Sequence, residues 1–195
     1  ILSDFDDHTV CRFLEWRRSS GVASSTVERD RYNILALWRF ANRKRLVDSW
    51  PDVEPELIPE RAALAWSQSD MRKLLDACKL AEGSIGKCPA SIFWQVLHLI
   101  LWDTGERIGA AINVKWVDVD LDQAVIACRA ETRKGKRKDR VYKIDQETVR
   151  MMRLIPRTGS EYVLSWPYSH TYLWYKYDRM LKKAGMPHDR LSKFH

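Results

Sequence analysis

The chain has 195 residues, 45% of them apolar and 30% charged, which excludes a disordered chain and leaves enough length to bury a core. Its longest apolar run lies around residues 92–102 and is interrupted by Gln95 and His98, so neither a membrane-spanning segment nor a signal peptide is expected. The formal net charge of +7 attracts polyanions. Nucleic acid is the first candidate partner and an acidic membrane the second, while a basic protein with neither partner is an equal alternative.

Two helices are predicted in the first part of the chain. Residues 4–19 follow helical spacing, with acidic side chains at the favourable N-terminal end. A second helix runs to about Arg45; Ser24 or Ser25 can cap it, and Glu28 stands three residues after Ser25 as in a capping box. One side of this helix is apolar, and the other carries the basic residues Arg29, Arg31, Arg39, Arg43, Lys44 and Arg45.

A linker is predicted next. Residues 48–61 contain three prolines and several acids, and proline fixes the backbone and removes hydrogen-bond donors. We therefore place a helical module at residues 1–50, a linker at 51–66 and a second domain at 67–195. Two helices make a thin core, so the first module is expected to lack an N-terminal piece or to lean on its neighbour.

The second domain is predicted to be mostly helical. A capped helix begins at Ser69 or Asp70 and ends near residue 81. Residues 90–103 are apolar nearly all round, which indicates a buried central helix. The remaining predictions are a short helix at 107–115, strands at 124–130 and 140–144, and helices at 145–155 and 169–184. The fold class is therefore mainly α with a small antiparallel β hairpin.

The four cysteines show no metal-binding or redox spacing. Cys11, Cys78, Cys88 and Cys128 form no C-x-x-C pair, and no histidine cluster lies near them at zinc spacing. This pattern is typical of reduced thiols in an intracellular protein, so we expect a cytoplasmic location and no metal site.

The turn between the two predicted strands is strongly basic. Its cations can enter a DNA groove and neutralise phosphates, or they can be a solvated hairpin tip that is kept charged to block edge pairing. The sequence of this segment alone favours neither the DNA-binding interpretation nor the solvated hairpin tip. The candidate phosphate contacts in the turn are Arg133, Lys134, Lys136, Arg137 and Lys138.

One segment resembles a known family. The run LWDTGERIGAAINVKWVDVDL at 101–121 is similar to the first arginine box of the tyrosine recombinases, also called phage integrases. In that box a buried helix ends at Thr-Gly, and an arginine, an apolar helix, a tryptophan and an aspartate follow. The matching residues are Thr104, Gly105, Arg107, Ile108, Trp116 and Asp118. The final LSKFH resembles the entry to the family's H-x-x-R box, with His195 as its histidine, and the resemblance covers residues 62–195.

The resemblance implies a helical core-binding module followed by a catalytic domain that cuts and rejoins DNA through a 3′-phosphotyrosyl intermediate, without metal or cofactor. Arg107 would clamp the phosphate, Lys134 would act as general acid with Lys136 as the alternative, and His195 would orient the phosphate or assist the nucleophile's proton. Arg39 and Arg43 would bind DNA together with the other bases of the turn. Double-stranded DNA is the expected partner, with a homotetramer forming on it and no membrane involved.

The resemblance has gaps. The family places an acidic residue shortly after its arginine, where this chain has Ala110 or Ala111, and Glu106 lies before Arg107 instead. The nucleophilic tyrosine would lie beyond His195, so we expect the fragment to bind DNA weakly without cleaving it. The alternatives are a non-catalytic DNA-binding protein or recombination regulator on the same fold, and an RNA-binding or repressor-type helical protein.

Overall fold

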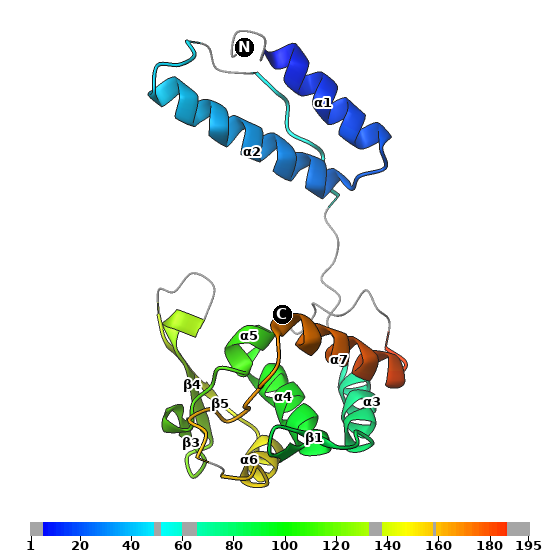
Figure 1. The fold of residues 1–195 in the computed structure, drawn as a ribbon, viewed down its shortest axis with the longest axis vertical. Helices are drawn as coiled ribbons and strands as arrows, with labels where there is room; N and C mark the ends of the chain where they lie inside the picture. Colours follow the sequence, from blue (N-terminus) through cyan, green and yellow to red (C-terminus); the bar gives the residue numbers. More distant parts are fainter. Residues whose placement is uncertain (1–5, 49–51, 60–65, 133–137, 158, 187–195) are drawn as a thin grey trace. The chain divides into compact units, whose positions relative to one another are not determined.

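A computed structural model describes residues 6–48, 52–59, 66–132, 138–157 and 159–186 (Figure 1). Packing divides the chain into two compact units, Ile1–Ala62 and Ala63–His195, and each is described by itself. The division falls inside the stretch 51–66 where a linker is expected. The role of the first unit as a DNA-binding module stays a prediction.

The first unit is a pair of helices, α1 (Asp7–Ser19) and α2 (Ser24–Arg43). The side chain of Asp6 caps α1 by accepting a hydrogen bond from the Thr9 amide at 2.8 Å. A small core joins the helices to the segment 52–59, and its buried members are Val10, Leu14, Val27, Trp38 and Val53.

The expected capping box of α2 is wrong. The N-cap residue is Ala23, which has no side-chain acceptor, and the two serines lie inside the first turn. The Glu28 carboxylate is used elsewhere, because it accepts hydrogen bonds from the Arg31 guanidinium and from the Glu56 amide, both at 2.9 Å. Arg31 also donates to the Val53 carbonyl at 2.9 and 2.7 Å. These bonds hold the segment 52–59 against α2.

The second unit is built around helix α4 (Ala90–Thr104). Helix α3 begins at Gln68, one or two residues earlier than expected, because Ser67 caps it and forms a capping box with Asp70. The described helices around α4 are α3 (Gln68–Lys79), α5 (Ile108–Ala111), α6 (Gln146–Arg153) and α7 (His170–Lys183), with 3-10 turns at Trp116–Asp118 and Ala130–Thr132 (Figure 1). Helix α5 is shorter than the 107–115 that the sequence predicts.

Two small antiparallel sheets complete this unit. The larger has the order β3 (Val119–Asp120), β4 (Val125–Cys128) and β5 (Arg140–Lys143). Its β4–β5 hairpin confirms the predicted fold class. The smaller sheet pairs β1 (Ser84–Ile85) with β2 (Cys88–Pro89). Sequence patterns missed it, as they missed β3, because two residues are too few to show alternation.

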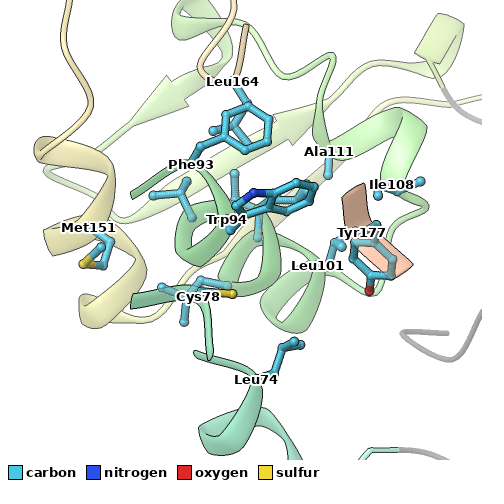
Figure 2. Close-up of a cluster of buried hydrophobic side chains, with 14 of the residues drawn as sticks. Leu74, Cys78, Phe93, Trp94, Leu101, Ile108, Ala111, Met151, Leu164 and Tyr177 are labelled. Carbon is cyan, nitrogen blue, oxygen red and sulfur yellow. The ribbon is translucent and has the colours of Figure 1, made fainter. Parts of the chain in front are cut away.

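The core of the second unit forms on all sides of α4, as its apolar sequence predicts. In Figure 2, Trp94 of α4 lies among side chains from other elements, including Ala111, Leu164 and Tyr177. His98 is fully buried one turn further along α4, with its ring stacked on that of Tyr177 at a centroid distance of 5.3 Å. In the described part of the chain, no helix is long and apolar enough to cross a membrane.

The end of α4 depends on a Thr-Gly pair. The Thr104 hydroxyl donates to the Ile100 carbonyl at 2.6 Å and accepts from the Glu106 amide at 3.2 Å. Gly105 takes a left-handed conformation, with φ of 61°, and its amide closes the helix onto Leu101 at 2.9 Å. The chain thereby leaves α4 at a fixed angle and enters α5.

We predict that Gly105→Ala destabilises the protein by about 1 kcal/mol, because a side chain with a Cβ is strained at this φ. Gly109→Ala is the matched control. Gly109 lies in α5. Apart from its chain neighbours and the backbone of its own helix, no heavy atom lies within 4 Å of the position that a Cβ would take. Urea unfolding should show a loss for Gly105→Ala and none for Gly109→Ala. Equal effects would contradict the assigned role of Gly105.

Candidate active site

Arg107 lies on the surface directly before α5. Its carbonyl accepts the Ala110 and Ala111 amides at 2.8 and 3.1 Å, which fixes its backbone at the start of the helix. Its neighbours Glu106 and Ile108 are buried, whereas Arg107 itself is exposed. Among the described residues, its guanidinium makes no hydrogen bond or ion pair. The backbone of Arg107 is therefore held at the start of α5, and its side chain is exposed.

The loop 105–107 is bonded to the hairpin. Glu106 is only 7% exposed, and its carboxylate accepts a hydrogen bond of 2.5 Å from the Tyr142 hydroxyl of β5. Arg140 lies two residues before Tyr142 on the same face of β5. A hydrogen-bonding interaction with Tyr142 is the main cause of a raised pKa of the Arg140 guanidinium, and the charge of Glu106 adds to it. The loop that carries Arg107 is thus linked through Glu106 and Tyr142 to the strand that carries the exposed Arg140.

A second set of contacts closes the base of the hairpin, and we call Asp118, Arg129 and Asp139 the hairpin clamp. The Nε atom of Arg129 donates to the buried Asp118 carboxylate at 2.7 Å, and its Nη1 atom donates to Asp139 at 3.0 Å. Asp139 also accepts from the Ala130 amide at 2.8 Å. Bonds to both carboxylates, that of Asp118 first, raise the pKa of Arg129. The clamp therefore fixes the residues on either side of 133–137.

We predict that Asp118→Ala lowers the melting temperature by about 5 °C, because Arg129 loses its buried partner at the base of the hairpin. Asp122→Ala is the control: the ion pair of Asp122 with Arg153 is exposed and should contribute little. Amide hydrogen exchange in β4 and β5 should be faster in Asp118→Ala alone. Unchanged exchange in that variant would refute the clamp.

Two further residues of the segment 101–121, Trp116 and Asp103, make contacts within the fold. The Trp116 amide donates to the Glu161 carbonyl at 2.8 Å, and the Arg157 guanidinium lies 3.4 Å from the centre of the Trp116 ring. Asp103, at the end of α4, accepts from the Thr148 hydroxyl at 2.6 Å and ties α4 to α6. Burial raises the pKa of Asp103.

The structure places only some of the predicted site residues. Lys138 is exposed two residues before β5, on the hairpin that also contacts the Arg107 loop. Arg39 and Arg43 are exposed one turn apart on α2, in the first unit. Arg133, Lys134, Lys136, Arg137 and His195 lie outside the described residues.

The tyrosines of the last described part are core and helix-face side chains. Tyr177 is 1% exposed and burial raises its pKa, so its hydroxyl cannot act as a nucleophile toward DNA. Tyr172 and Tyr175 are exposed and stack on each other along α7, at a centroid distance of 5.9 Å. In the described part of the chain, no three His, Cys, Asp or Glu residues come together as a metal site.

The fold of the second unit, with an arginine between its central helix and a β hairpin, is that of the tyrosine recombinase catalytic domain. The chain is 26% identical, over 98% of its residues and 67% of the relative's length, to the tyrosine recombinase XerA of Thermococcus kodakarensis. The resemblance to the tyrosine recombinases is thereby confirmed. No model of a known protein family matches the chain.

Two solved structures share the fold at low sequence identity. The XerH recombinase bound to a palindromic difH substrate, in a post-cleavage complex, superposes with a TM-score of 0.69, 16% identity and coverage of 98% of this chain and 60% of that one. A lambda integrase tetramer bound to a Holliday junction gives a TM-score of 0.71, 14% identity and coverage of 95% and 53%. The chain therefore spans only part of the length of the proteins it resembles.

Proposed function

We propose that this chain is the part of a site-specific DNA recombinase, or integrase, that binds DNA and supplies the phosphate-clamping arginine. The observation that carries the proposal is the placement of Arg107: an exposed guanidinium on a loop fixed between two buried residues, in the fold that tyrosine recombinases use. Guanidinium suits this role because its paired donors fit two non-bridging oxygens of one phosphate.

In the proposed reaction, a tyrosine hydroxyl attacks the phosphorus of a DNA phosphodiester and gives up its proton with the assistance of His195. The bond between phosphorus and the 5′ oxygen breaks, a 3′-phosphotyrosyl bond forms, and the 5′ oxygen takes up a proton as it leaves. Lys134 is proposed to give that proton, with Lys136 as the alternative, and His195 to orient the phosphate. Arg107 stabilises the extra negative charge on the phosphorane-like transition state. The nucleophilic tyrosine would lie in a segment beyond the residues of this chain, and no step requires a metal.

Double-stranded DNA is the proposed partner. Arg39 and Arg43 on α2, together with Lys138 and the bases of the turn 133–137, supply cations for the phosphate backbone. The similarity to proteins solved with difH DNA and with a Holliday junction supports this partner, and the lambda integrase tetramer supports a homotetramer on DNA. Such a reaction takes place where the DNA is, which in a bacterial or archaeal cell is the cytoplasm.

Fluorescence anisotropy with a mixed-sequence duplex tests the partner. We expect weak binding whose affinity falls steeply, by about 10³-fold or more if six or more phosphates are contacted, between about 50 and 200 mM salt. An absence of salt-dependent binding at the lower concentration would contradict the proposal. Binding to an RNA duplex that is clearly tighter than to DNA would favour the RNA-binding alternative.

A non-catalytic regulator on the same fold is the second candidate. It is favoured by one observation, because Ala110 and Ala111 occupy the positions where the family carries an acidic side chain near its arginine. A regulator would bind DNA and tolerate the loss of Arg107. The two candidates therefore differ in what the Arg107 variant does to strand cleavage.

A further inference from the structure

We propose that Glu106 and Tyr142 are positioning residues that take the place of the missing acidic side chain. Through them Arg140 is held beside the Arg107 loop as a second phosphate-binding cation. This inference rests on the proposed function, because it names a further DNA contact of the same site.

Helix α5 itself offers no carboxylate to the arginine loop. Ala110 is 2% exposed and Ala111 is fully buried, so these positions are packed with methyl groups. The buried carboxylate comes from the opposite side of Arg107 in the sequence, where Glu106 points into the protein. A buried carboxylate needs a hydrogen-bond partner, and the Tyr142 hydroxyl provides one at 2.5 Å.

Strand β5 places Arg140 on the same side as Tyr142. Residues two apart in a strand point the same way, and Tyr142 is held in register opposite Ile126, which is fully buried in β4. The Tyr142 hydroxyl donates to Glu106, and an interaction with Tyr142 is the main cause of the raised pKa of Arg140, so the Arg140 side chain lies near the loop 105–107. Lys143 has the same sign of charge but belongs to the opposite face of the strand.

Two guanidiniums on a loop and a strand that are in contact suit a phosphate. The negative charge of Glu106 attracts the Arg140 guanidinium and so favours its place beside the loop 105–107. A phosphodiester has two non-bridging oxygens, and each can accept hydrogen bonds from a separate guanidinium. Glu106 and Tyr142 would act only through these arginines, without touching DNA.

Variants of Glu106 separate positioning from charge. Glu106→Gln removes the negative charge but keeps an oxygen that can accept from Tyr142, whereas Glu106→Leu removes both. If Glu106 acted only through its charge, which repels DNA, both variants would bind a mixed-sequence duplex more tightly than the wild type and to the same extent. Positioning predicts that Glu106→Gln binds at least as tightly as the wild type, whereas Glu106→Leu binds about threefold to tenfold more weakly.

Tyr142→Phe gives an independent measurement, which matters if Glu106→Leu does not fold. It should weaken binding of the duplex in the wild-type background and have no effect in an Arg140→Ala background, because the hydroxyl acts through Arg140. Arg140→Ala should lower the slope of log affinity against log salt by about 0.9. Lys143→Ala, on the other face of β5, is the matched control and should change that slope less.

Three outcomes would overturn the inference: equal affinities of Glu106→Gln and Glu106→Leu, a Tyr142→Phe variant that melts at a lower temperature but binds DNA as the wild type does, or equal slopes for Arg140→Ala and Lys143→Ala. Each leaves the proposed function standing, provided that the wild-type chain binds the duplex in a salt-dependent way. If the wild type does not bind at all, the proposed function fails together with the inference.

Discussion

Replacing Arg107 by alanine is expected to slow DNA strand cleavage by about 100-fold or more, corresponding to about 3 kcal/mol of lost transition-state stabilisation. The measurement is the single-turnover rate in a protein that joins this chain to its nucleophilic tyrosine. Affinity for DNA should change only a few-fold, because one phosphate contact of many is lost. The guanidinium matters most when the phosphate gains charge, so the effect falls on the rate.

Two further variants make this result specific. Arg107→Lys keeps the charge but not the paired donors, so it should recover only part of the rate. Arg153→Ala removes an exposed arginine whose ion pair with Asp122 lies outside the candidate site, and it should cleave like the wild type. A wild-type rate in Arg107→Ala would support the regulator and not the enzyme.

The buried His98 should make the fold sensitive to acid. Its Nδ1 atom lies 2.6 Å from the Trp94 carbonyl oxygen, which can only accept, so Nδ1 carries the proton of a neutral ring. Complete burial lowers the pKa of His98 from its ordinary 6.5 to about 4. As the pH falls from 6.5 to 4, His98 becomes protonated in the unfolded chain but stays mostly neutral in the folded chain. The free energy of unfolding should therefore drop by about 3 kcal/mol across this window, with no contribution above it.

Urea unfolding at a series of pH values measures this loss. His98→Asn keeps an amide donor in the position of Nδ1 but does not titrate, so its stability should depend less on pH between 6.5 and 4. Leu97→Ala, at a buried neighbouring position of α4, should lower stability by about 2–5 kcal/mol at every pH and keep the wild-type slope. Parallel curves for the wild type and His98→Asn would show that His98 is not the group responsible.

The parts of the fold that could be predicted are those with long or specific local signals. Helix α4 is apolar nearly all round over 15 residues, and a central helix buries such a surface. The Thr104–Gly105 break could be located because glycine favours the left-handed conformation that ends a helix. Arg107 followed from this break and from the family resemblance, and its exposure fits the role that the resemblance implies.

What could not be predicted are contacts between residues far apart in the chain. Glu106 and Tyr142 are separated by 36 positions, and the bonds of Arg129 to Asp118 and Asp139 span 11 and 10. Arg129 looks like any other base of the turn in the sequence, although the structure uses it to close the hairpin. The register of β4 with β5 brings Arg129 near Asp139, and the packing of β5 beside the loop after α4 brings Tyr142 to Glu106. No local pattern encodes either arrangement.

Covalent capture of DNA tests the central proposal most directly. The protein that extends this chain through its H-x-x-R box and tyrosine would be incubated with nicked duplexes of randomised sequence, and adducts that resist detergent would be isolated and mapped. We expect a 3′-phosphotyrosyl adduct with the extended protein, almost none with its Arg107→Ala variant, and none with the 195-residue chain. An adduct on Tyr162, Tyr168, Tyr172, Tyr175 or Tyr177, or equal adduct yields with and without Arg107, would contradict the proposed function.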